Sequence, residues 1–190
     1  HSYANSENEN KLKEFLLKYL PDVEVSISSD VCPEIREYER FTTTVVNSYI
    51  KPLISTYLKN LDTKLKQKGF YCPLLLMTSG GTLTNVTSAC NNPVRLVESG
   101  PAGGAILATS IAEDLKLDKV ISFDMGGTTA KITIIENQKA IKAREFEVDR
   151  KARFKKGSGL PLRIPVIEMV EIGAGGGSIA RVNKLDQIIT

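Results

Sequence analysis

The strongest constraint on the fold of this chain is a pair of consecutive glycines between two segments of strand-forming residues. Residues 120–124 are mostly apolar, residues 125–128 contain the two glycines, and residues 132–135 are rich in β-branched side chains. β-Branched residues favour extended backbone because they lose less side-chain freedom there. The glycine turn is therefore expected at the tip of a β-hairpin. In dinucleotide-binding and P-loop proteins the glycine loop opens a helix instead, so the pattern disfavours both of those folds.

The turn carries the groups needed for a phosphate and metal site. Gly126 and Gly127 let backbone N–H groups approach an anion without a Cβ in the way. The hydroxyls of Thr128 and Thr129 can donate further hydrogen bonds to phosphate oxygens. The carboxylate of Asp124 can hold the hydration shell of a Mg²⁺ ion that the phosphates bring with them. The alternative is a tight hairpin in which Asp124 only helps to form the turn.

A second glycine-rich segment, residues 173–177, follows a predicted strand at residues 166–172. Its glycines are Gly173, Gly175, Gly176 and Gly177, and they leave backbone exposed to a close ligand. The alternative is a flexible connection between strands. Residues 99–104 are also small and precede a predicted helix that reaches about residue 115. They either bind an anion at the helix N-terminus or pack the helix tightly on a sheet.

The sequence pattern of the rest of the chain predicts both helices and strands, so we assign an α/β fold. We expect a helix at residues 12–20, a short strand at 23–27, and a long helical stretch to about residue 68. That stretch has expected breaks at 42–44 and before Pro52. Residues 74–77 indicate a strand buried on both faces, and residues 140–149 a third strand after the hairpin. The acidic pairs Glu145/Glu147 and Glu168/Glu171 are interpreted as solubilising residues of strands or strand edges rather than an acid/base pair.

Composition excludes several functional classes. The only histidine is His1, which argues against histidine-based nucleophilic catalysis and histidine-ligated zinc within this chain. A net charge of +3 is too small to indicate nucleic-acid or membrane binding, and no apolar run is long enough to span a bilayer. The five basic residues within 150–156 indicate a solvated loop. Three cysteines without C-x-x-C spacing favour core positions in a reducing cytoplasm.

The chain resembles a known family through three motifs in order. These are the helix-opening segment at 99–104, Asp-Met-Gly-Gly-Thr-Thr-Ala-Lys at 124–131, and the glycine segment within 171–180. The hairpin motif resembles the actin-like ATPase superfamily of sugar kinases, actin and heat-shock chaperones. The three motifs together are similar to the hydantoinase A/oxoprolinase family. Residues 36–40 and 161–165 also lie where that family has similar residues, so the resemblance covers about residues 23–185.

The resemblance implies an actin-like (ribonuclease H-like) ATPase fold, in which a β-meander carries the phosphate-binding hairpin and helices pack against it. It also implies ATP and Mg²⁺ as cofactors, with Asp124 as the catalytic and metal-organising residue. The implied reaction is ATP-dependent opening of a cyclic amide, such as a hydantoin or 5-oxoproline, through phosphorylation of the amide oxygen. A hydantoinase B-type subunit or domain is the implied partner. Residues 1–22 are then an N-terminal tail and helix, and residues 23–190 the central portion of the family domain.

Two departures from the family pattern leave alternatives open. Nothing before residue 120 matches the earlier Asp-Gly-Gly-Thr element that family members generally carry, so half of the nucleotide cleft is expected to be missing. The isolated segment is accordingly expected to show little or no activity. Many members also continue the hairpin with Ser-Thr-Asp, where this chain has Thr-Ala-Lys at residues 129–131. Two roles for Lys131 stay open: contact with phosphate, or a side chain that points to solvent from the hairpin. The alternatives are an ATP-dependent ketone carboxylase subunit and a non-catalytic structural module. A sugar kinase is disfavoured because no convincing catalytic aspartate is present.

Overall fold

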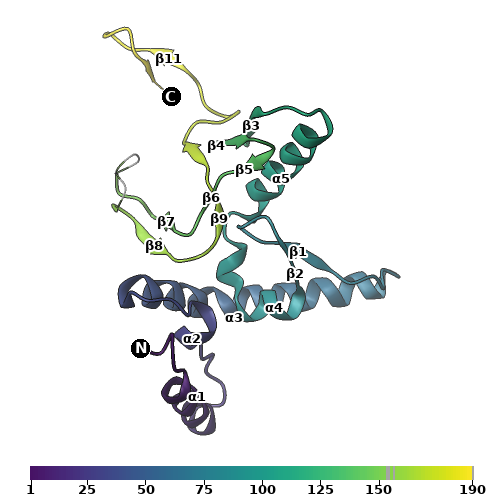
Figure 1. The fold of residues 1–190 in the computed structure, drawn as a ribbon, viewed down its shortest axis with the longest axis vertical. Coiled ribbons are helices and arrows are strands. Elements are labelled where there is room, and N and C mark those ends of the chain that lie inside the picture. Colours follow the sequence, from purple (N-terminus) through teal and green to yellow (C-terminus); the bar gives the residue numbers. More distant parts are fainter. Residues whose placement is uncertain (153–154, 156, 190) are drawn as a thin grey trace. The chain divides into compact units, whose positions relative to one another are not determined.

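The computed structural model describes residues 1–152, 155 and 157–189. It divides into two compact units, one formed by residues 1–99 and 143–166 and the other by residues 100–142 and 167 onward (Figure 1). Three residues of the basic loop (Arg153, Phe154 and Lys156) and Thr190 lie outside the described residues. Among the helices that the described residues form, none has the length and apolarity needed to cross a bilayer.

The first unit is organised around one long helix. Its helices are α1 (Glu7–Tyr19), α2 (Ser28–Val31), α3 (Glu37–Gln67), α4 (Val86–Asn91) and the 3-10 helix η1 (Pro93–Leu96). α3 packs against α2, α4, η1 and one strand, β8 (Leu160–Leu162). The expected breaks in α3 are wrong, because the helix continues through residues 42–44 and contains Pro52. Packing along its length outweighs the cost of one interior proline.

Two other predictions for this unit are wrong. Residues 23–27 are described and form no strand, and they lead directly into α2. Strand β1 (Leu75–Met77) exists, but it pairs only with β2 (Leu83–Asn85) in a two-stranded antiparallel sheet. Leu75 is consequently 52% exposed, so the strand is not buried on both faces.

The remaining strands of this region are short. β7 (Phe146–Val148) pairs antiparallel with β8. β6 (Lys142–Ala143) and β9 (Val166–Ile167) contain two of the positions at which the sequence passes from one unit to the other. The predicted third strand at 140–149 is thus divided into pieces. The main core cluster consists of Val31, Cys32, Val94, Leu162, Ile164 and Val166, and a second consists of Leu58, Ala89 and Cys90. Two cysteines are therefore core residues as expected, whereas Cys72 is exposed.

A buried amide on α3 satisfies the backbone that follows α4. The Asn47 side chain is fully buried. Its Nδ2 donates to the Asn91 carbonyl at 3.1 Å, and its Oδ1 accepts from the Val94 N–H at 3.2 Å. Buried backbone groups need such partners because water cannot reach them. Asn47 thus joins the long helix to the segment between α4 and η1.

The interpretation of Glu147 as a solubilising residue is wrong, because its carboxylate is buried and organises the loop between β7 and β8. Glu147 accepts from the N–H groups of Gly157 at 2.7 Å and Gly159 at 3.3 Å, and from Arg150 Nε at 3.1 Å. The hydrogen bond from the Gly157 N–H is the largest effect and lowers the pKa of Glu147. Gly159 and Arg150 lower this pKa further, whereas burial raises it. The loop ends are therefore held by the charged form of one side chain.

The second unit contains a four-stranded antiparallel sheet and one helix. β3 (Lys119–Met125) and β4 (Ala130–Glu136) form a hairpin, β10 (Val170–Ile172) pairs with the start of β4, and β5 (Lys139–Ala140) pairs with its end. Helix α5 (Ser99–Asp114) places its small residues Ala102 and Ala105 against Ile167. β11 (Arg181–Val182) and β12 (Ile188–Ile189) form a separate two-stranded sheet. β3, β4 and β5 follow one another as antiparallel neighbours, but β5 has only two residues, so most of the expected third strand of the meander lies outside this sheet.

Replacing Asn47 with alanine is expected to lower the free energy of unfolding by about 2 to 4 kcal/mol, because a buried N–H and a carbonyl lose their partner. Urea unfolding at neutral pH measures this loss. Asn60→Ala, at an exposed position of the same helix, is the matched control and should change stability by less than about 0.5 kcal/mol. Equal effects of the two substitutions would show that the buried amide does not stabilise the unit.

Glu147 should make stability depend on pH. Its folded pKa lies below its unfolded value of about 4.3, so its contribution is present above that value and disappears as pH falls through the folded pKa. The stability gap between the wild type and Glu147→Gln should therefore be largest above about pH 5 and shrink on acidification. Urea unfolding from pH 7 to pH 3 measures the gap, with Glu14→Gln on exposed α1 as control. A gap that does not change with pH would contradict the assignment.

Candidate functional site

The predicted glycine turn is the tip of a β-hairpin, as expected. β3 and β4 pair in register up to Met125 opposite Ala130, and the Gly126 N–H donates to the Thr129 carbonyl at 2.9 Å. The chain after Thr129 continues directly into β4 and not into a helix. The two ends of the turn are thus fixed by the ladder beneath it.

The second glycine segment lies directly on this turn. The Gly176 N–H donates to the Gly126 carbonyl and the Gly177 N–H to the Gly127 carbonyl, both at 2.9 Å. The segment reaches the turn because β10, which precedes it, pairs with the start of β4. Two glycine motifs that are far apart in sequence therefore form one continuous main-chain surface.

Gly175 is required for this close approach. A Cβ at Gly175 would lie 2.5 Å from the Gly126 carbonyl oxygen and 2.7 Å from the Thr128 nitrogen, which is too close for any side chain. Ser178 closes the segment, since its Oγ accepts from the Gly175 N–H at 3.0 Å. Gly173 precedes this contact, directly after β10. The absence of a side chain at residue 175 is thus explained by packing against the turn.

The outer side of the turn suits an anion. No atom lies within 4 Å of the place where a Cβ of Gly127 would be, and residues 126–128 are exposed. Within the described part of the chain, the N–H groups of Gly127 and Thr128 and the Thr128 hydroxyl make no hydrogen bond. Free main-chain donors on an open glycine turn are the groups that hold phosphate oxygens. The residues present therefore fit a nucleotide phosphate.

Asp124 lies next to the turn, near the end of β3, with an exposed side chain. Among the described residues, no group of three or more histidine, cysteine, aspartate or glutamate side chains could hold a metal ion. A single carboxylate does not form a complete metal site, but it can contact the water shell of a phosphate-bound Mg²⁺.

Two further charged residues lie beside Asp124 in the sheet: Lys131, expected either to contact phosphate or to point to solvent, and Glu171, expected to be a solubilising residue. Lys131 is directly opposite Asp124 in the β3–β4 pair and directly opposite Glu171 in the β4–β10 pair. The lysine Nζ is 3.9 Å from the Glu171 carboxylate. A signal was present in the sequence, since lysine replaces the acid of the family pattern at residue 131, but the strand pairing was needed to identify its neighbours.

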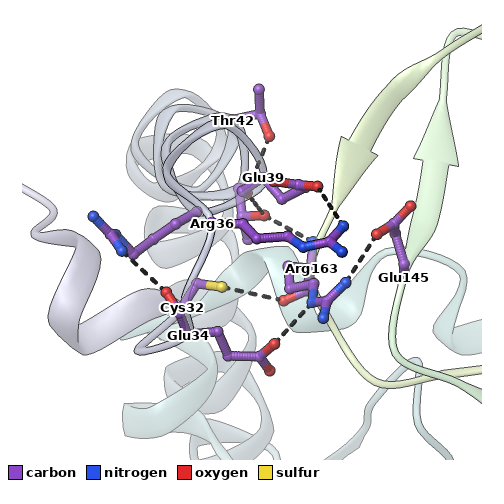
Figure 2. Close-up of polar contacts among 9 residues, drawn as sticks. Cys32, Glu34, Arg36, Glu39, Thr42, Glu145 and Arg163 are labelled. Atoms are coloured by element: carbon purple, nitrogen blue, oxygen red, sulfur yellow. Dashed lines mark hydrogen bonds and ion pairs between the residues drawn. The ribbon is translucent and has the colours of Figure 1, made fainter. Parts of the chain in front are cut away.

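Two further stretches of family likeness, residues 36–40 and 161–165, contribute to a structural network in the first unit (Figure 2). Arg163 Nε donates to the Glu34 carboxylate at 2.8 Å, and its NH1 donates to the Glu145 carboxylate at 3.0 Å. The hydrogen bond to Glu34 is the largest of the effects that raise the pKa of Arg163. The Arg163 N–H donates to Thr43 Oγ1 on α3 at 2.8 Å. This network ties the start of α3 to β8.

Two cavities lie in the first unit. One of 340 Å³ is lined by polar residues that include Lys13, Lys51, Asn91 and Asn92. A smaller one of 180 Å³ lies beside β2 and α4. None of the predicted site residues lines either of these two cavities.

Comparison with known proteins gives a consistent result. The family model described as hydantoinase/oxoprolinase matches residues 40–189. An uncharacterised protein of Methanocaldococcus jannaschii is 44% identical over 187 residues, which cover 97% of this chain and 28% of the relative. Caprolactamase subunit alpha of Pseudomonas jessenii is 31% identical and is matched over 98% of this chain and 26% of its own length. The chain thus spans about a quarter of the length of these relatives.

The fold is also found in a solved structure. The nucleotide-free structure of acetone carboxylase, described as an enzyme of ATP-dependent acetone carboxylation, superposes with a TM-score of 0.80 at 25% identity. The match covers 100% of this chain and 26% of that one. The mixed α/β fold is therefore shared with a much longer enzyme chain.

Replacing Gly175 with alanine is expected to separate the glycine segment from the turn, because the new Cβ would overlap the Gly126 carbonyl. Amide hydrogen exchange at residues 176 and 177 should then accelerate by at least about tenfold. Gly176→Ala is the matched control, since its Cβ would be 3.8 Å from that carbonyl, an ordinary contact. Unchanged exchange in the Gly175 variant would show that the two segments are not in close contact.

Proposed function

Because this chain belongs to the hydantoinase/oxoprolinase family, we propose that it is the ATP-binding portion of an ATP-dependent enzyme that opens cyclic amides. Its substrate class is a hydantoin, an oxoproline or a related lactam. The relative named caprolactamase supports a cyclic amide as substrate. Because the chain spans about a quarter of its relatives, the complete reaction requires residues outside this segment.

One observation carries the proposal: the segment at 173–177 lies on the hairpin turn and leaves the outer N–H groups of that turn free. Such a surface is suited to a nucleotide phosphate, the ligand that the resemblance to the family implies. Phosphoryl transfer needs positioning and charge neutralisation more than a protein nucleophile. A chain whose only histidine is His1 can therefore take part in it.

Each site residue has a distinct role in this proposal. The N–H groups of Gly127 and Thr128 hold phosphate oxygens, with the hydroxyls of Thr128 and Thr129 as further donors. Asp124 holds the water shell of Mg²⁺ and so orients the phosphates. When bound, ATP would supply a phosphoryl group to the amide oxygen, which would activate the carbonyl carbon for attack by water; the ring C–N bond would then break and phosphate would leave. Gly173, Gly175, Gly176 and Gly177 form the segment that flanks the nucleotide.

The fold-level part of the proposal is an actin-like ATPase unit. The β3–β4 hairpin with a third paired strand and a covering helix is consistent with that superfamily. Residues 23–190 are then the central portion of the family domain. A hydantoinase B-type subunit or domain is the proposed partner, which the designation of the caprolactamase relative as a subunit supports.

The second candidate function is ketone carboxylation. The superposition on acetone carboxylase favours it, because that enzyme is also described as ATP-dependent. Both functions use the same phosphate surface and differ in the molecule that accepts the phosphoryl group. A non-catalytic module of the same fold is the third possibility, and it predicts no nucleotide binding.

Mg-ATP is expected to stabilise the protein against unfolding by about 2.7 kcal/mol at a ligand concentration of 100 Kd. Asp124→Asn should weaken Mg-ATP binding at least about tenfold, because the amide no longer attracts the hydrated cation. Calorimetric titration and urea unfolding with and without Mg-ATP measure both effects.

Asp118→Asn is the matched control, since Asp118 precedes β3 at the opposite end of the same hairpin. That variant should bind Mg-ATP as the wild type does. No stabilisation of the wild type by Mg-ATP would overturn nucleotide binding and favour the structural module. Hydantoin-dependent or ketone-dependent ATP consumption, measured after adding the partner subunit, separates the two enzymatic candidates.

A further inference from the structure

Three charged side chains form a row across the sheet just before the glycine turn. Asp124 on β3 is opposite Lys131 on β4, and Lys131 is opposite Glu171 on β10. Directly opposed residues of antiparallel strands share one face of the sheet, with Cβ atoms about 5 Å apart. The row therefore places a lysine between two acidic residues on the same face.

This face is the more buried side of the sheet. Thr133 and Ile135 alternate with Lys131 along β4 and are both buried. The Lys131 side chain is only 14% exposed, whereas the Glu171 side chain is 50% exposed. Withdrawing an ammonium group from water is costly unless opposite charges compensate for it. Lys131 is thus held at the sheet and does not extend into solvent from the hairpin.

The row lies next to both glycine segments. Lys131 follows Thr129 by two residues, or about 7 Å of extended strand, and Glu171 precedes Gly173 by the same number. The flexible four-carbon stem of lysine can span such a distance. Residues 124–131 contain no other cationic side chain. Without Lys131, the turn would offer a polyanion only neutral donors and the negative charge of Asp124.

We propose that Lys131 contacts the phosphate groups of the nucleotide bound at the turn, and that Glu171 is a positioning residue that holds the lysine ammonium in the row. The inference rests on the proposed nucleotide binding and adds the charge partner of the phosphates. It assigns a role to the lysine that stands where many family members have an acid. Nucleotide binding by this chain then depends on a fixed protein cation as well as on Mg²⁺.

Substitution of Lys131 by methionine, which keeps most of the stem, tests the contact. Affinities for Mg-ATP and for inorganic tripolyphosphate without metal should each fall about ten- to hundredfold, because a charge-assisted hydrogen bond is lost. Affinity for adenosine should stay unchanged. Lys131→Arg should retain tripolyphosphate binding within about threefold, since the charge is kept. Glu171→Gln should weaken tripolyphosphate binding less than Lys131→Met does, because the cation remains but is less well placed.

Lys119→Met is the matched control, because Lys119 is an exposed lysine at the opposite end of the same hairpin. Isothermal titration measures the affinities, and thermal unfolding confirms that each variant folds. Failure of the wild type to bind Mg-ATP would overturn the proposed function and this inference with it. If the wild type binds but Lys131→Met retains the tripolyphosphate affinity of Lys119→Met, only the role of Lys131 is overturned. An equal loss of adenosine and tripolyphosphate binding would indicate a structural role and also reject the contact.

Discussion

Two main-chain hydrogen bonds connect the glycine segments on which the candidate site depends. They run from Gly176 to Gly126 and from Gly177 to Gly127, and they form only because Gly175 has no side chain. Main-chain atoms alone make the contact, so little side-chain entropy opposes it. Because one set of glycine carbonyls is used inward, the N–H groups on the other side of the turn remain free for an anion. The contact continues the pairing of β10 with β4, which also places Glu171 opposite Lys131.

The first unit follows a different principle, in which buried polar side chains satisfy irregular backbone. Asn47 supports the segment after α4, Glu147 holds the loop between β7 and β8, and Arg163 joins the start of α3 to β8. The strands of this unit are short and provide few ladder hydrogen bonds, so side chains satisfy part of its irregular backbone.

The hairpin and its turn were predictable because their signals are local. β-Branched residues flank two glycines, and no tertiary contact is needed to favour strand, turn and strand there. Other local signals gave wrong predictions of secondary structure. Pro52 suggested a break in α3, yet packing on several sides keeps the helix continuous. The alternation at residues 23–27 suggested a strand, but no partner strand is available to complete its hydrogen bonds in the described structure. Strand formation requires a neighbour, which a single segment cannot reveal.

The order of residues along the chain was therefore sufficient to establish the hairpin, the glycine motifs and the family they resemble. It also excluded histidine chemistry, because the necessary side chains are missing from the chain interior. Folding in three dimensions decided which of these pieces meet. The contact between residues 175–177 and the turn, and the row formed by Asp124, Lys131 and Glu171, arise from the pairing of β10 with β4. Such pairing joins segments far apart in sequence, and its register follows from packing of the whole sheet and not from any local pattern.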